Sequence, residues 1–158
     1  MHIPTCPSQA LDILSFAQAQ VPTNDDFDRD NWLYIPDHYA EYRYLLGTKG
    51  ANPLICIGIN PSTAAPGALD NTLKSVERIA KGNGFDSFLM FNVYAQRATR
   101  PDDMEPTCNA ALHAENRKAF RYLLSLSETP AIWAAWGNII EKRDYLMDCM
   151  RDFAADGQ

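Results

Sequence analysis

The sequence predicts an α/β fold, a three-layer αβα domain with a mainly parallel central sheet. Continuous apolar runs of strand length occur at residues 54–60, 87–94 and 131–136, and a segment with helical periodicity follows each of them. Short connections between alternating strands and helices are typical of parallel strands joined by right-handed crossovers, with helices on both faces of the sheet. The length of 158 residues suits one such domain.

The chain before the first apolar run predicts a peripheral helix, a loop and a strand. Apolar residues recur at helical spacing within residues 8–20, and the turn-rich residues 21–30 follow. Residues 42–47 predict an antiparallel edge strand. We therefore expect residues 1–41 to form a helix and loop packed on a single α/β domain of residues 42–158.

Each apolar run leads into a predicted helix. The first helix begins at Asp70 or Asn71, either of which can cap its N-terminus, and ends near Gly82. The other two helices are expected at about 109–126 and 139–153, where apolar residues recur on one side.

The charge of the chain limits the partners that it can bind. A formal net charge of −6 excludes a basic field over the whole molecule, so any nucleic-acid contact has to be local. Residues 51–100 carry five basic and three acidic residues. Lys74, Arg78 and Lys81 recur at helical spacing, which predicts either a solvated helix face or a patch that contacts phosphates.

The spacing of the cysteines and histidines does not indicate a metal site. The four cysteines lie roughly 40 to 50 residues apart without metal-ligand spacing, and the three histidines are isolated. No charged leader precedes an apolar run, and no 18-residue apolar stretch occurs. We expect reduced thiols, a cytoplasmic location, no cofactor and no membrane partner; the sequence assigns no oligomeric state.

Two asparagines end predicted strands, Asn60 in the first apolar run and Asn92 in the second. A buried amide is costly unless its donors and acceptors are used, so each side chain either contacts a ligand or ties down a neighbouring loop. Ligands of such sheets bind at the carboxyl ends of the strands. We expect Asn60, Asn92 and Trp136 to line one crevice there, and Asn60→Ala to change stability little.

Four motifs carry a family resemblance. GINPSTA (58–64), DNT (70–72), FNVYAQRATRP (91–101) and WGN (136–138) are similar to a bacterial family catalogued as domain of unknown function 1643. The same strand ends, more distantly, resemble those of the uracil-DNA glycosylase superfamily, which implies a glycosylase-like fold.

The glycosylase resemblance also implies residue roles. Asn60, in GINP, corresponds to the residue that positions the attacking water, and Asn92 to the one that reads the Watson–Crick edge of uracil. The segments 95–97 and 134–138 resemble the motifs that follow in that superfamily. Its C-terminal motif with His and Pro has no counterpart before Gln158, so we expect a C-terminally truncated domain.

The chemistry of N-glycosidic bond cleavage selects the candidate residues. It needs a positioned water, donors for the departing base and a pocket that isolates the base. The candidate catalytic residues are Asn60 and Asp70, and the candidate substrate-binding residues are Pro61, Ser62, Thr63, Asn92, Tyr94, Arg97, Trp136 and Gly137. The alternatives are a helix cap for Asp70, loop hydrogen bonds for Ser62 and Thr63, an acidic partner for Arg97, and a core position for Trp136.

Two functions therefore compete. The first is a glycosylase that binds a nucleobase or nucleotide at the strand ends and hydrolyses an N-glycosidic bond. The alternative is a non-catalytic nucleotide or nucleic-acid binding module, which the missing C-terminal motif favours. In either case the acidic chain predicts that nucleobases or nucleotides bind better than long duplex DNA.

Overall fold

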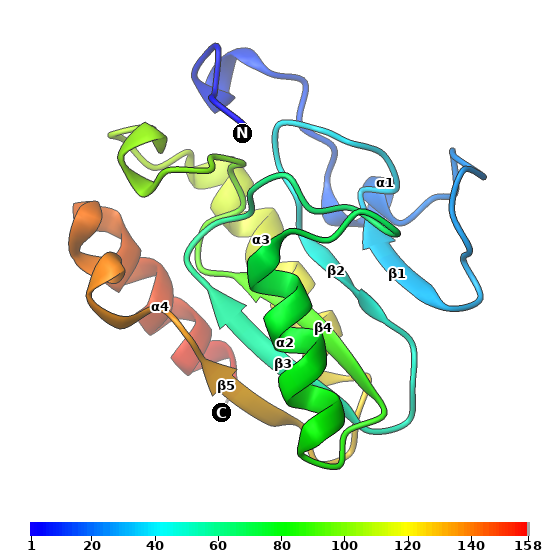
Figure 1. Cartoon of the computed structure of the whole chain (residues 1–158). Coiled ribbons are helices and arrows are strands. Elements are labelled where there is room, and N and C mark those ends of the chain that lie inside the picture. Colours follow the sequence, from blue (N-terminus) through cyan, green and yellow to red (C-terminus); the bar gives the residue numbers. More distant parts are fainter. Residues whose placement is uncertain (158) are drawn as a thin grey trace.

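The computed structural model describes residues 1–157, except that the side chains of residues 137 and 138 lie outside this description. Within it, five strands form one mixed sheet in the order β1-β2-β4-β3-β5 (Figure 1). The strands are β1 (Trp32–Ile35), β2 (Leu45–Thr48), β3 (Pro53–Gly58), β4 (Ser87–Asn92) and β5 (Ala131–Ala134). The helices are α1 (Phe16–Ala19), α2 (Asn71–Gly82), α3 (Ala110–Leu124) and α4 (Asp144–Asp156), with 3-10 turns η1 (Ser8–Ala10), η2 (Pro101–Asp103) and η3 (Gly137–Lys142).

The three predicted crossover strands are parallel. β3 pairs with β4 on one side and with β5 on the other, and α2 and α3 make the two crossovers. In the register, Gly58 of β3 lies beside Asn92 of β4, so the carboxyl ends of these strands are level. The α/β prediction is therefore confirmed.

The sheet is mixed because its other two pairings are antiparallel. β1 pairs with β2, and β2 pairs with β4, so the predicted antiparallel direction of residues 42–47 is confirmed. Their predicted edge position is wrong, because β1 covers the outer side of β2. β1, in which two of the four residues are half-buried, was not predicted from the sequence.

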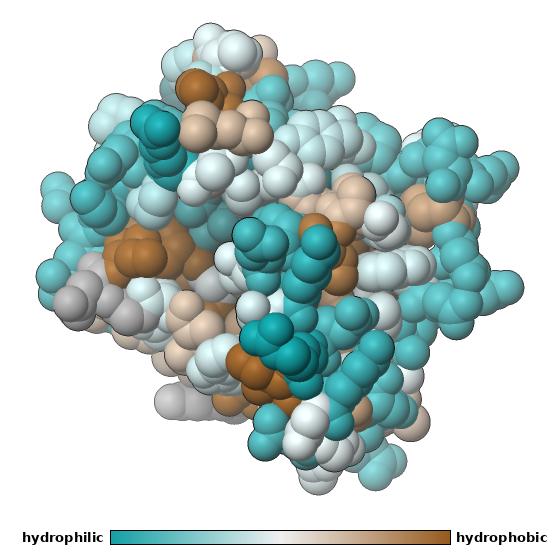
Figure 2. Space-filling view, in the orientation of Figure 1, coloured by the Kyte–Doolittle hydropathy of each residue, from teal (hydrophilic) through white to brown (hydrophobic). Residues whose placement is uncertain are grey.

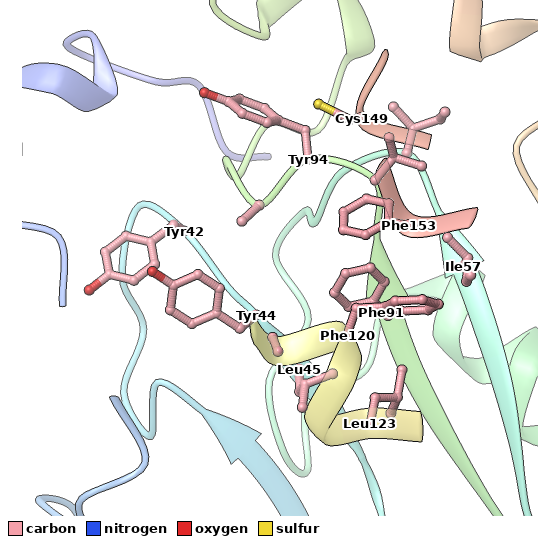
Figure 3. Packing of buried hydrophobic residues seen from close by; sticks show 14 of the residues in the cluster. Tyr42, Tyr44, Leu45, Ile57, Phe91, Tyr94, Phe120, Leu123, Cys149 and Phe153 are labelled. Atoms are coloured by element: carbon pink, nitrogen blue, oxygen red, sulfur yellow. The ribbon is translucent and has the colours of Figure 1, made fainter. Parts of the chain in front are cut away.

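Alternate side chains of β3 and β4 enter two cores on opposite faces of the sheet. Leu54 and Cys56 pack in the core under α2, whereas Ile55 and Ile57 pack in the core that includes α3 and α4. In Figure 1, α2 lies in front of the sheet and α3 behind it. Figure 3 shows aromatic rings from β4, α3 and α4 meeting in the second core.

The helix predicted over residues 8–20 is wrong. The structure has the turn η1, an extended segment, and then the short helix α1. The reason is tertiary: the backbone N–H of Leu14 donates to the hydroxyl of Tyr42 at 2.9 Å, and the hydroxyl of Tyr44 donates to the Leu14 carbonyl at 2.8 Å. Ser15 then begins α1 with a capping box.

The apolar runs are longer than the strands they contain. β3 and β4 end two residues before the predicted ends, although the Val93 and Tyr94 N–H groups still donate to the carbonyls of Gly58 and Ile59 at 2.9 Å. The helix predicted from about residue 139 begins at Asp144, because η3 occupies residues 137–142.

Across the described residues, no helix combines the length and apolar composition needed to cross a bilayer.

Candidate functional site

A pocket of about 570 Å³ lies at the carboxyl ends of the parallel strands. The chain leaves β3 toward α2 on one face of the sheet and leaves β5 toward α4 on the other, so the pocket occupies the switch point where α/β folds bind ligands. Asn60, Asn92 and Trp136 all line it, as the sequence predicts. The lining also includes Arg43, Gly58, Pro61, Ser62, Asp70, Thr99 and Trp133.

The amide of Asn92 is buried in the wall of this pocket, with 2% of the residue exposed. Its Oδ1 accepts a hydrogen bond from Nη2 of Arg43 at 3.3 Å, which orients the amide. Its Nδ2 lies 3.1 Å from the position that a Cβ on Gly58 would occupy, and no described residue accepts a hydrogen bond from it. Glycine at position 58 therefore leaves the Asn92 amide nitrogen open to the pocket.

Arg43 is a buried cation in the same wall, with 1% of the residue exposed. Its guanidinium makes two long hydrogen bonds, to Asn92 Oδ1 at 3.3 Å and to the Ala64 carbonyl at 3.4 Å. Its Nε has no partner among the described residues. Burial, and then the nearby charge of Arg97, lowers the pKa of Arg43 to about 9.

Arg97 lies behind this wall, and its guanidinium binds groups of the protein. Its guanidinium donates to the carbonyls of Ser62 and Ala64 and to the hydroxyl of Tyr34, and it stacks 4.0 Å from the ring centroid of Tyr39. It is not a lining residue of the pocket. Arg97, a predicted substrate-binding residue, therefore does not reach the pocket in this structure, whereas Arg43 lines it.

Asn60 ties two loops together. Its Nδ2 donates to the carbonyls of Ala98 at 2.8 Å, Pro61 at 3.2 Å and Gln96 at 3.3 Å. The tethering alternative left open by the sequence is thus realised. Asn60 still lines the pocket, and no described residue donates to its Oδ1, which remains the atom that can accept from a water or ligand.

Asp70 caps α2 at the mouth of the pocket. Its Oδ1 accepts from the backbone N–H of Leu73 at 2.9 Å, as expected of an N-cap residue. Among the described lining residues it is also the one carboxylate. The cap uses one carboxylate oxygen, so the other can accept a proton from a water in the pocket.

Hydroxyl groups and indoles complete the lining. The hydroxyl oxygens of Ser62 and Thr99 lie 2.8 Å apart, which holds the loop after β3 against the loop after β4. Trp133 and Trp136 come from β5 and the segment that follows it. Both residues line the pocket, and an indole there is a suitable surface for a flat heterocycle.

Two more predicted site residues, Thr63 and Tyr94, do not line the pocket, as is also true of Arg97. Thr63 lies in the loop but not in the lining. Tyr94 is fully buried on the other side of the sheet, where its hydroxyl donates to Glu105 at 2.5 Å. Gly137 lies in η3, outside the residues whose side-chain positions the structure describes.

The basic helix face is separate from the pocket. Lys74, Arg78 and Lys81 are exposed on α2 and do not line the pocket. Figure 2 shows hydrophilic residues gathered over α2 on the face toward the viewer. Among the described residues, no three His, Cys, Asp or Glu side chains gather as a metal site.

Arg43, Thr99 and Trp133 line the pocket but were not predicted from the sequence, and Arg43 is the charged one among them. It lies alone between Tyr42 and Tyr44, with no motif around it. A signal was present, because a charged residue within a short, otherwise apolar predicted strand has to be paired or to face a polar pocket. That signal becomes specific only when the fold brings Arg43 next to Asn92, 49 residues further along the chain.

Comparisons with known proteins identify a family. No curated protein and no solved structure matches this chain. A family model described as "Protein of unknown function (DUF1643)" matches residues 43–155, a range that begins at Arg43 and includes every strand-end motif of the pocket. The chain therefore belongs to the DUF1643 family.

Proposed function

We propose that the pocket binds a nucleobase or nucleotide and hydrolyses its N-glycosidic bond. The observation that carries this proposal is the buried Asn92 amide, whose Oδ1 faces Arg43 and whose Nδ2 is open to the pocket. Such an amide can donate to a base carbonyl. Trp133 and Trp136 offer an indole surface against which a flat base stacks.

The remaining lining residues suit the reaction. Water attacks the anomeric carbon, the carbon–nitrogen bond breaks, and the base departs with the bonding electrons. Asp70 accepts the proton of the water through the carboxylate oxygen that the helix cap leaves free, and Asn60 Oδ1 orients that water. Asn92 Nδ2 stabilises the negative charge on the departing base.

The resemblance to the uracil-DNA glycosylase superfamily supports the same roles. GINP places Asn60 after β3, and FN places Asn92 at the end of β4. The proposed glycosylase-like arrangement and the assignment of Asn60 to water and Asn92 to the base rest on these motifs together with the pocket.

A non-catalytic binding module is the second candidate. Two observations favour it: the Asn60 amide nitrogen is committed to three carbonyls, and Asp70 is committed to its helix cap. In that case the pocket keeps base binding through Asn92 without a group that activates water.

Calorimetry and product analysis test the two candidates. Uracil and UMP are expected to bind at moderate salt with little salt dependence, and more tightly than a duplex oligonucleotide. Asn92→Ala should weaken base binding at least tenfold, whereas Lys74→Ala, on the exposed face of α2, should not. Chromatography of incubated uridine and UMP detects released uracil: release supports hydrolysis, and binding without release supports the module.

One result contradicts both candidates. Tight, strongly salt-dependent duplex binding without any binding of uracil or UMP assigns the function to a nucleic-acid surface. The basic face of Lys74, Arg78 and Lys81 is then the surface to test, by charge reversal at Arg78.

A further inference from the structure

We propose that Arg43 is an anion-binding residue of the pocket and that the ligand presents to it a compact oxyanion, a phosphate or a carboxylate. This inference deepens the proposed function and rests on it in one respect: it assigns a charge to the ligand of the same pocket. It rests on the position, burial and hydrogen bonds of a residue that belongs to none of the strand-end motifs.

Within the described part of the chain, Arg43 has hydrogen-bond donors without acceptors. A guanidinium carries five N–H donors in a planar fork. Arg43 uses two of them, at 3.3 and 3.4 Å, both long for a hydrogen bond from a charged group. Its Nε is buried without a partner among the described residues. Arg43 lines the pocket, which is where its unused donors can find an acceptor.

The buried charge of Arg43 has no carboxylate partner among the described residues. Buried cations in proteins are nearly always paired, because an unpaired charge carries a large desolvation cost. Within the described residues, the arginines with a carboxylate within 4.0 Å are Arg29, Arg117, Arg121 and Arg151. Arg43 has none, and the cation of Arg97 donates to the same Ala64 carbonyl. An anion in the pocket would supply the missing pair.

The donors of Arg43 and Asn92 determine which shape of anion fits. Arg43 Nη2 and the Asn92 amide are in contact, so the spare Arg43 donors and Asn92 Nδ2 form one donor surface. That surface suits two oxygens of a phosphate or carboxylate held side by side. Asp70, the carboxylate in the described lining, is engaged at the start of α2 by the Leu73 N–H and is not within ion-pair distance of Arg43.

The test places a carboxylate inside the protein. Asn92→Asp replaces the amide oxygen bonded to Arg43 by a carboxylate of the same shape. We expect this variant to melt at a higher temperature than the wild type without added anion, because Arg43 gains its pair. It should also lose any stabilisation by external anions. Lys74→Ala, outside the pocket, is the matched control and should behave as the wild type.

The measurement is the melting temperature with added potassium phosphate or potassium acetate, at ionic strength matched with KCl. A saturable rise of about 5 °C is expected for the wild type and for Lys74→Ala at saturating anion, and none for Asn92→Asp. A rise with phosphate alone assigns a phosphate, and a rise with acetate alone assigns a carboxylate. A rise with neither anion, or an equal rise in Asn92→Asp, overturns the inference.

A second variant and a second ligand keep the result interpretable. If Asn92→Asp fails to fold by circular dichroism, Arg43→Gln replaces it and should also lose the anion-dependent rise; an equal rise in that variant overturns the inference. Calorimetry with uridine separates the two proposals. If uridine and uracil do not bind while the anion effect stands, the nucleobase proposal fails and the anion site remains.

Discussion

Asn60 lies two residues after β3 and Asn92 ends β4, its parallel neighbour, yet the structure gives their amides different tasks. Asn60 donates to three carbonyls of the surrounding loops, whereas Asn92 meets one arginine and leaves its nitrogen open. The sequence could predict that both amides lie at the pocket. It could not predict which one is committed to the protein, because the carbonyls that Asn60 binds belong to loops whose path the tertiary fold decides.

The three hydrogen bonds that Asn60 donates to loop carbonyls stabilise the fold. We expect Asn60→Ala to lower the free energy of unfolding by about 1 to 2 kcal/mol, since it leaves carbonyls in two loops without their donor. This differs from the small effect expected from sequence. Urea denaturation of the wild type and Asn60→Ala measures the change; a loss below about 0.5 kcal/mol would show that water replaces the amide at no cost.

Gly58 controls access to the Asn92 amide. A Cβ at this position would lie 2.7 Å from Met90 Cε and 3.1 Å from Asn92 Nδ2. The methionine end can move, but the amide is held by Arg43, so Gly58→Ala should weaken base binding at least tenfold and cost about 1 kcal/mol of stability. Calorimetry and urea denaturation of one preparation separate the two effects, and unchanged affinity for uracil would exclude the proposed contact.

At the scale of elements, the apolar runs predicted β3, β4, β5 and the parallel crossovers. Burial on both faces explains the continuous runs of β3 and β4, whereas β5 keeps an apolar run although its side chains are largely exposed. The same reasoning failed for the N-terminal segment. There the backbone of Leu14 is bound by two tyrosine hydroxyls, contacts between residues about 30 positions apart that no local periodicity encodes. Arg43 escaped notice for the same physical reason, since its role depends on Asn92.

Asp70, the N-cap of helix α2, has two proposed roles: it caps the helix, and it accepts the proton of the attacking water. Two substitutions at Asp70 separate these roles. Asp70→Asn keeps an oxygen for the Leu73 N–H, so stability should change by less than about 0.5 kcal/mol, whereas Asp70→Ala should cost about 1 kcal/mol. Both remove the carboxylate and should abolish base release. If Asp70→Asn retains full release of uracil, Asp70 is a cap alone.

At the scale of the whole molecule, the acidic chain buries both a cation, Arg43, and a carboxylate, Asp37. The pocket wall holds a buried cation in a protein of net charge −6. Asp37, just after β1, joins the N-terminal loop to the end of that strand: it accepts from the Thr23 N–H at 2.6 Å, from the Asn24 N–H at 3.0 Å, and from Arg29.

The Asp37 contacts predict an acid-sensitive contribution to stability. Burial raises its pKa, but the hydrogen bonds from Thr23 and Arg29 outweigh burial and hold the pKa well below 3.8. A carboxyl with a lowered folded-state pKa stabilises the fold above its unfolded pKa, and this contribution is lost as pH falls below that value. Asp37→Asn should cost about 2 kcal/mol at pH 7.

Chemical denaturation at two pH values checks this prediction. The difference in unfolding free energy between wild type and Asp37→Asn should be largest at pH 7 and should shrink at pH values below 3.8, the ordinary value of the carboxyl. A difference that stays constant with pH would assign the cost of the substitution to packing rather than to the charge.

β5 has a neighbour on one side only, and its side chains are the least covered of the sheet: Ile132 is 47% and Trp133 38% exposed. β3, in contrast, is buried along its length between two strands. Amide hydrogens of β5 should therefore exchange with deuterium through local opening, well before those of β3. Because Trp133 and Trp136 line the pocket, a bound ligand should slow exchange in this strand and leave β3 unchanged, so deuterium uptake at residues 131–136 reports occupancy of the site without any assay of chemistry.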